Sequence, residues 1–194
     1  MKAICVYCGT NNSFNLAYLP IAQAVGQFLA RHHIRLIYGG GTTGIAGALA
    51  DAMLQYGGKV TGIIPNFLLD TEKGHNQINE LIVVKSMHER KTKMFEMADG
   101  FIALPGGMGT LEELCEMLTW AHLGLHQKPI GLLNVHGFYD KLLDFLDHAV
   151  NQGFYKAEHR AMLIHDTHIE SLYEKMLLYA PSRKTRIIKD KKST

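Results

Sequence analysis

Short apolar runs alternate with amphipathic stretches along almost the whole chain, and this alternation constrains the fold more than any other feature. The runs have the length of strands, and the segments between them carry apolar residues at helical spacing. Strands are expected at residues 3–7, 35–38, 59–64, 81–85, 100–104, 129–133 and 162–165. Helices are expected at residues 16–30, 45–56, 87–98, 111–123, 139–152 and 168–179. This pattern predicts an α/β protein, with an open parallel sheet flanked by helices on both faces.

The length and the charge of the chain narrow the class of protein. Its 194 residues, 47% of them hydrophobic, suit one domain. We expect residues 1–180 to form that domain and the basic residues 181–194 to be a solvated tail. The 20 Lys and Arg against 18 Asp and Glu leave a formal charge of +2, too little for a protein whose main task is to bind nucleic acid. The first residues lack an apolar run of the length of a signal or membrane segment, so a cytoplasmic enzyme or small-molecule binder is expected.

Neither disulfide nor metal chemistry is indicated by the cysteines and histidines. The cysteines number three, and Cys5 lies inside an expected strand, so Cys5-x-x-Cys8 is interpreted as buried or incidental thiols rather than a redox pair. Cys115 receives the same interpretation within an expected helix. The 11 histidines are scattered without the spacing of a ligand cluster, and no metal site is expected.

Two glycine clusters, at residues 38–47 and 105–113, follow expected strands and precede expected helices. Ligands of an open parallel sheet bind beyond the carboxyl ends of its strands. Glycine lets backbone N–H groups approach a ligand, and the start of a helix attracts an anion. Phosphate or nucleotide binding is therefore expected, although tight turns alone would also explain glycines. The candidate binding glycines are Gly41, Gly44, Gly106, Gly107 and Gly109.

The segment from Ser86 to Lys91 places cations where an apolar stripe is expected. Ser86 and Glu89 have the spacing of a capping box, which explains Glu89 structurally. Lys91 lies on the same helical face as Met94, and Arg90 lies at its edge. Snorkelling of long side chains is one explanation. The other is that Arg90 and Lys91 hold an anionic ligand near the second glycine cluster, because a guanidinium suits phosphate oxygens.

Acidic residues crowd the start of the helix that follows the second glycine cluster. Thr110 and Glu113 also have capping-box spacing, which is the structural explanation of Glu113. Glu112 and Glu116 lie beside it, where acids would repel a bound phosphate unless they serve another part of the ligand. A carboxylate near the anomeric carbon of a sugar stabilises the positive charge that develops when a glycosidic bond breaks. A nucleoside monophosphate held by its phosphate would present its sugar to such a carboxylate.

Two motifs resemble those of the LOG ("Lonely guy") family, whose members were earlier labelled lysine decarboxylases. Residues 105–113 match the P-G-G-x-G-T-x-x-E signature, and residues 87–91 match the M-H-E-R-K element. The resemblance covers residues 2–179 and implies a Rossmann-like fold, usually a homodimer. It also implies hydrolysis of cytokinin riboside 5′-monophosphates (N6-modified AMP), or of AMP, to the free base and ribose 5-phosphate. No metal or organic cofactor is implied.

The resemblance also implies roles for individual residues. Arg90 and Glu113 would be the catalytic pair. The substrate-binding residues implied by matching position are Lys91, Gly107, Gly109, Thr110, Glu112, Thr119 and, in the long polar loop of residues 66–79, Glu72. The chain departs from the family pattern at residues 10–12, at Met108 and before Glu72, where the usual arginine is absent. These departures bear on base preference rather than on the reaction class.

Two other functions remain open from the sequence. A non-catalytic nucleotide or cofactor carrier on the same fold would keep the glycine clusters and Arg90 but would not need Glu113. A pyridoxal phosphate decarboxylase would need a Schiff-base lysine, and the sequence singles out none.

Overall fold

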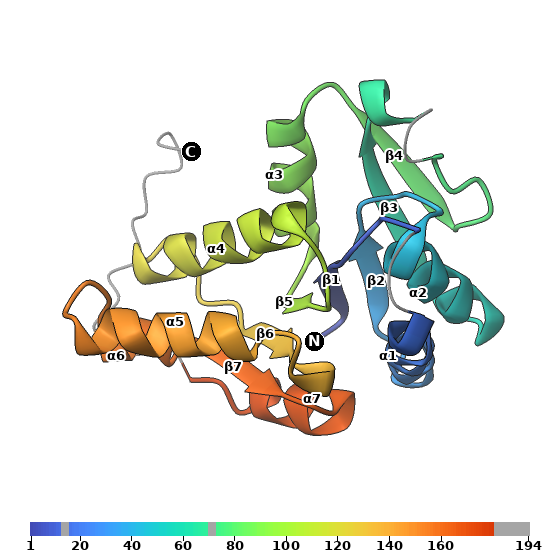
Figure 1. The fold of residues 1–194 in the computed structure, drawn as a ribbon. Coiled ribbons are helices and arrows are strands. Elements are labelled where there is room, and N and C mark those ends of the chain that lie inside the picture. The colour runs from blue at the N-terminus through green and yellow to red at the C-terminus, as the bar shows by residue number, and fades with distance from the viewer. Residues whose placement is uncertain (13–15, 70–72, 181–194) are drawn as a thin grey trace.

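The computed structural model describes residues 1–12, 16–69 and 73–180, which form a seven-stranded parallel sheet with helices on both faces (Figure 1). The strand order is β4-β3-β2-β1-β5-β6-β7. The strands are β1 (Ala3–Tyr7), β2 (Arg35–Tyr38), β3 (Val60–Pro65), β4 (Glu80–Val84), β5 (Gly100–Ala103), β6 (Ile130–Leu133) and β7 (Leu163–Asp166). The α-helices are α1 (Leu19–Arg31), α2 (Gly44–Gln55), α3 (Met87–Met97), α4 (Met108–His122), α5 (Asp140–Asn151), α6 (Ala157–Arg160) and α7 (Ile169–Leu177). The predicted fold class is confirmed.

Side chains alternate between the two faces of the sheet, and each face has its own core. Ile4 and Val6 of β1 pack with α1, α2 and α7 on one face. Ala3, Cys5 and Tyr7 pack with α3, α4 and α5 on the other. All five residues of β1 are buried, because this central strand is covered on both faces.

The connections turn in opposite directions on the two sides of β1. From β1 the chain proceeds to β2, β3 and β4 on one side, and it returns to β5 on the other side before adding β6 and β7. Such a reversal opens a crevice beyond the carboxyl ends of the two strands at which it occurs. Both predicted glycine turns lie at this edge of the sheet, one after β2 and the other after β5.

The structure differs from the sequence-based elements at the following helices, among others. The predicted helix at 16–30 is a short 3-10 turn (Leu16–Tyr18) followed by α1, with Pro20 at the start of the α-helix. Helix α4 begins at Met108, three residues before the predicted 111, because the backbone of the glycine cluster is already helical there. Helix α6 was not predicted, since four residues are too few to show a helical period.

Residues 181–194, which include the predicted basic tail, lie outside the described residues. Among the residues described, no helix has both the length and the apolar character needed to cross a membrane.

Candidate active site at the carboxyl ends of β1, β2 and β5

Arg90 is a buried cation that helix α3 directs at the end of β2. The helix starts as predicted, because the Ser86 hydroxyl oxygen accepts a hydrogen bond from the Glu89 N–H at 3.1 Å. The Glu89 carboxylate accepts from the Lys85 N–H at 2.8 Å, one residue before the expected partner. Arg90 lies on the inner face of α3 and is only 6% exposed. Its Nη2 donates to the carbonyl oxygen of Gly39 at 3.0 Å.

The glycine at position 39 is required by this arginine. A Cβ atom built on Gly39 would overlap the Arg90 guanidinium, so a side chain there would displace the cation. The first glycine cluster therefore leaves room for the Arg90 side chain in addition to forming the turn. Sequence reasoning placed Gly39 in the cluster but did not single it out, since nothing in the spacing shows which residue of α3 reaches it.

Arg90 and Glu113 line the same small cavity, as the sequence-based pairing required. The cavity, of about 30 Å³, lies beyond the carboxyl ends of β1 and β2, and Cys8, Tyr38 and Gly41 also line it. Glu113 is half-buried on α4 and Arg90 comes from α3, so two helices on one face of the sheet bring these side chains together. The arrangement places the guanidinium of Arg90 and the carboxylate of Glu113 at one cavity beyond the ends of the strands.

The thiols beside the cavity are not activated. Burial first, and the negative charge of Glu113 second, raise the pKa of Cys8 well above its ordinary value. The same two causes raise the pKa of the buried Cys5. Because the thiolate is the reactive form, both groups stay protonated and inert at neutral pH. Cys5, Cys8 and Cys115 are free cysteines, and Cys115 is exposed.

Tyr38 is a cavity-lining residue that sequence reasoning missed. Its side chain is fully buried, and its hydroxyl has no hydrogen-bond partner among the described residues. Burial raises the pKa of Tyr38, so the hydroxyl stays protonated and can donate. This role could not be predicted from the sequence, because a tyrosine at the end of a strand is an ordinary core residue.

The second glycine turn contains glycines of two kinds. A Cβ atom on Gly106 would meet the Thr110 hydroxyl and would lie 2.8 Å from the backbone nitrogen of Gly9, so packing requires a glycine there. A Cβ atom on Gly107 or Gly109 would meet nothing within 4 Å, and neither residue has a positive φ. The chain's own structure therefore does not explain Gly107 and Gly109. These two leave open space at the first turn of α4, whose N-cap residue is Gly107.

The expected capping box of Thr110 and Glu113 is wrong. Helix α4 starts earlier than predicted, so Thr110 lies inside its first turn, where it is 4% exposed and packs under Gly106. The N-cap residue of α4 is Gly107, which has no side chain to cap the helix. Glu113 consequently has no capping role, which removes the structural explanation that the sequence had offered for it. Thr119 lies further along α4, where it is exposed and outside the lining of the cavity.

Lys91 binds two acids of α4 in the structure. Its Nζ lies 2.5 Å from a carboxylate oxygen of Glu112 and 2.9 Å from one of Glu116. Burial alone lowers the pKa of Lys91, but the hydrogen bonds to the two glutamates outweigh it and raise the pKa, so the ammonium stays charged. These ion pairs join α3 to α4 and so fix the helices that carry Arg90 and Glu113. The sequence had grouped Lys91 and Glu112 as ligand contacts and did not reveal that they pair with each other.

The end of the long loop returns over the first glycine turn. Gly74 forms an antiparallel bridge with Gly41, and the His75 N–H donates to the Gly40 carbonyl at 2.8 Å. Gly44 adopts a positive φ of 65°, and its N–H donates to the side-chain oxygen of Asn12 at 2.9 Å. Gly41 therefore lines the cavity, whereas Gly44 shapes the turn that opens α2. Glu72 lies outside the described residues.

No group of three or more His, Cys, Asp or Glu side chains arranged to hold a metal ion occurs within the described ranges. The polar side chains that line the cavity include Arg90, Glu113 and Tyr38. Gly107 and Gly109 lie outside this lining, at the start of the helix that carries Glu113. This set suits an anion and a sugar, because the guanidinium and the backbone N–H groups donate and the carboxylate accepts.

Comparisons with known proteins identify the family of the chain. A family model described as "Possible lysine decarboxylase" matches residues 46–176. The cytokinin riboside 5′-monophosphate phosphoribohydrolase LOG5 of Arabidopsis thaliana is 44% identical over 180 residues, 93% of this chain and 79% of the relative. The corresponding enzyme LOG of Oryza sativa subsp. japonica is 43% identical over 189 residues, 97% of this chain and 78% of the relative.

Solved structures with the same fold include carrier proteins. The molybdenum cofactor carrier protein of Chlamydomonas reinhardtii superposes with a TM-score of 0.68 at 17% identity, covering 91% of this chain and 98% of that one. The molybdenum cofactor binding protein of Rippkaea orientalis has a TM-score of 0.61 at 25% identity, covering 78% and 87%. The first likeness is one of fold alone, and the identity to the phosphoribohydrolases is much higher. By the family model and by these relatives, the chain is a member of the LOG family.

Proposed function

We propose that the protein is a phosphoribohydrolase that cleaves the N-glycosidic bond of N6-modified AMP, the cytokinin riboside 5′-monophosphates, or of AMP. The products are the free base and ribose 5-phosphate. The observation that supports this most directly is the shared cavity of Arg90 and Glu113, at the strand reversal and close to a helix start whose glycines leave open space. Relatives at 43–44% identity carry the name of this activity.

Each part of the site has a chemical task in this proposal. The substrate phosphate binds at the uncapped start of α4, where backbone N–H groups and the helix dipole favour an anion, and Gly107 and Gly109 allow its close approach. Arg90, in the cavity that it shares with Glu113, neutralises the negative charge of the substrate and aligns it. Lys91 and Glu112 hold α3 and α4 together, and Thr110 supports the turn. Glu72 and Thr119 are assigned substrate contacts by motif position alone.

Glu113 is the residue that acts at the sugar. As the bond from C1′ to the base nitrogen breaks, its electron pair leaves with the base and positive charge develops on the ribose. The Glu113 carboxylate stabilises this charge and orients a water, whose oxygen bonds to C1′. One proton of that water stays on the new hydroxyl group at C1′. The other proton is transferred to the departing base. Water is the only co-reactant in this step.

The test is release of free base from AMP and from isopentenyladenosine monophosphate, followed by chromatography. We expect the wild type to release base, and we expect Glu113→Gln and Arg90→Ala to reduce kcat/KM by at least about 100-fold, as loss of one transition-state-stabilising group does. Glu96→Gln is the matched control, because Glu96 is an exposed acid on α3. Circular dichroism of each variant separates lost chemistry from lost folding. Full activity in Glu113→Gln would refute its assigned role.

A carrier function is the second candidate, because the molybdenum cofactor binding proteins share this fold. A carrier would bind a nucleotide and leave it intact, and Glu113→Gln would not change its affinity. Recovery of both nucleotides unchanged after incubation with the protein would favour this function. Formation of cadaverine from lysine and pyridoxal phosphate would instead favour the decarboxylase description.

Three further properties belong to the proposal. The active form is a homodimer; the exposed apolar residues Met108 and Leu123 at the two ends of α4 are candidates for the contact between subunits. The molar mass of the protein in solution tests whether it is a dimer.

The protein works in the cytoplasm, where free thiols such as the exposed Cys115 stay reduced. Residues 1–180 form one catalytic domain, and residues 181–194 are a dispensable tail.

A further inference from the structure

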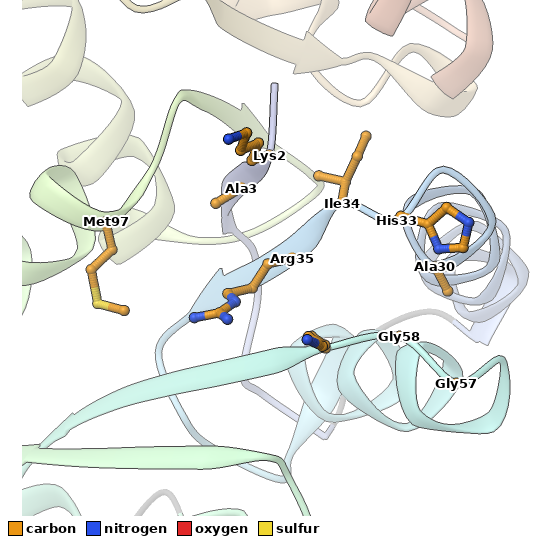
Figure 2. Close-up of a pocket in the computed structure, with 10 residues that line it drawn as sticks. Lys2, Ala3, Ala30, His33, Ile34, Arg35, Gly57, Gly58 and Met97 are labelled. Atoms are coloured by element: carbon orange, nitrogen blue, oxygen red, sulfur yellow. The ribbon is translucent and has the colours of Figure 1, made fainter.

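A second and larger cavity lies at the opposite edge of the sheet, at the amino ends of β1, β2 and β3 (Figure 2). Its volume is about 510 Å³, which is the size of a small-molecule site. The walls come from the start of β1, the turn from α1 to β2, the turn from α2 to β3 and the end of α3. The cavity shares no residue with the candidate active site.

Three permanent cations surround this cavity. Lys2, Arg35 and Lys59 each stand at the start of a neighbouring strand. Leu36 pairs with Val60 in the register of β2 and β3. Arg35 and Lys59 are the residues before these two, so they lie beside each other. Like charges in such a position repel each other and weaken the sheet. The folded chain therefore keeps an unfavourable pair at the edge of a cavity.

The acids near these cations form no direct ion pair with them among the described residues. No ion pair within 4 Å joins Lys2, Arg35 or Lys59 to an acid in the part of the chain that the structure describes. Asp99 accepts hydrogen bonds from the backbone N–H groups of Lys2 and Ala3, at 2.5 and 3.0 Å. Glu80 accepts from the Thr61 hydroxyl at 3.2 Å, in an adjoining hollow that Arg35 and Lys59 also line.

The cavity combines this charge with apolar walls. The apolar part of its lining consists of Ala3, Ala30, Ile34 and Met97. In Figure 2 the Arg35 side chain extends to the side on which Met97 lies, away from His33. The Gly57 and Gly58 N–H groups donate to carbonyls of α2, so the turn offers no free backbone donors at these positions. A ligand would be held by the cationic side chains and by apolar contact, unlike the backbone cradle of the active site.

We infer that this cavity binds a phosphorylated small molecule with an apolar portion, such as a nucleoside diphosphate, at a site separate from the catalytic one. Two adjacent cations suit the multiple negative charges of a diphosphate, and the planar guanidinium of Arg35 fits phosphate oxygens in a bidentate manner. The cavity is concave and of limited volume, which suits a small molecule rather than a nucleic acid. Binding also relieves the repulsion between Arg35 and Lys59.

The experiment titrates ¹⁵N-labelled full-length protein with inorganic pyrophosphate and, separately, with ADP, at constant ionic strength. The amide signals of Gly57 and Gly58 report on this cavity, and those of Gly107 and Gly109 report on the candidate active site. We expect saturable shifts of the Gly57 and Gly58 signals with both probes. ADP should bind at least fivefold more tightly there than pyrophosphate, because only ADP can contact the apolar wall.

Variants assign the binding to the two cations. Arg35→Gln/Lys59→Gln should weaken pyrophosphate binding at the Gly57 and Gly58 signals at least tenfold, with an unchanged circular dichroism spectrum. The matched control Lys93→Gln/Lys141→Gln removes the same charge from exposed positions on α3 and α5 and should change affinity less than twofold. Base release by Arg35→Gln/Lys59→Gln should equal that of the wild type, so this test is independent of the proposed activity.

Three results would overturn the inference. The first is the absence of shifts at Gly57 and Gly58 with either probe. The second is an equal loss of affinity in the control pair, which would mean that net charge alone governs binding. The third is equal affinity for ADP and pyrophosphate, which would remove the role of the apolar wall.

Discussion

Single glycines at the second turn show what sequence reasoning reached at the residue scale and what it did not. The glycines of residues 105–113, between an expected strand and an expected helix, predicted a turn that binds phosphate, with a tight turn alone as the alternative. It could not show that Gly106 is fixed by packing against Thr110 whereas Gly109 faces open space. That difference depends on which atoms of β1 and α4 approach the turn, and the chain brings those together only when folded.

Gly109→Ala should therefore separate stability from binding. Gly109 lies within the first turn of α4, and its added methyl group meets nothing in the protein. Alanine in a helix is favoured over glycine by about 0.5–1 kcal/mol, so the melting temperature should stay the same or rise. The same methyl group occupies space proposed for the phosphate, so KM for AMP should rise about tenfold or more. Thermal denaturation and steady-state base release measure the two effects.

Gly106→Ala is the contrasting variant at the same turn. Its methyl group would overlap the Thr110 hydroxyl and crowd the backbone of Gly9, so unfolding should become easier by about 1–3 kcal/mol. A destabilised Gly109→Ala together with a stable Gly106→Ala would contradict the distinction between the two glycines.

At the scale of elements, strands and helices were predictable where a period runs over several turns. The seven strands and the six longer helices all appear near their expected positions, because an alternating chain must bury one face of each helix. The early start of α4 was not predictable, since its first residues include glycine, which disfavours a helix on its own. The turn before that start is held in place by the backbone of Gly9, whose N–H donates to the Pro105 carbonyl at 3.1 Å.

The start of α7 makes an element-scale prediction about pH. Burial alone raises the pKa of Asp166, but hydrogen bonds from Lys175, Ser171 and the N–H groups of His168 and Thr167 outweigh it and hold the pKa well below its usual range. Asp166 lies 2.8 Å from the Lys175 ammonium and so joins β7 to α7. Asp166→Asn should lower the free energy of unfolding at pH 7 by about 1 kcal/mol.

The sign of the pH dependence follows from the lowered pKa. The unfolded chain binds a proton at Asp166 more readily than the folded one, so this stabilisation is complete above the unfolded pKa of about 3.9 and decreases as the pH falls through the folded value. Urea unfolding at pH 7 and at pH 3 should show a smaller difference between wild type and Asp166→Asn at the lower pH. Asp144→Asn is the control, because its exposed contact with Lys141 at 3.9 Å contributes little. A difference that grew with acidity would contradict this account.

At the scale of the whole molecule, the parallel order of the strands places two cavities at opposite edges of one sheet. Alternation of strands and helices predicted that order, and the glycine turns predicted the edge at which the candidate active site lies. The cavity at the amino ends could not be predicted in this way. Lys2, Arg35 and Lys59 are far apart in the sequence and look like ordinary solvated cations until the register of β1, β2 and β3 is known.

The positive charge of the chain is concentrated in residues 183–194. Residues 183–194 hold six of the 20 Lys and Arg but only one of the 18 Asp and Glu, so without them the formal charge changes from +2 to −3. Only two of these twelve residues, Ile187 and Ile188, are apolar.

Deletion of residues 183–194 should accordingly change charge without changing catalysis. At pH 7.5 the shortened protein should bind to an anion exchanger instead of a cation exchanger, while kcat/KM for AMP stays within about twofold of wild type, because the main-chain donors at α4 and Arg90 act within the site. Long-range steering of an anionic substrate is screened over about 8 Å at physiological ionic strength, so loss of the basic segment has little effect there. At low salt the deletion should slow capture of AMP, and added salt should abolish the difference. A tenfold loss of activity that persists at high salt would mean that these residues contact the substrate or the domain directly.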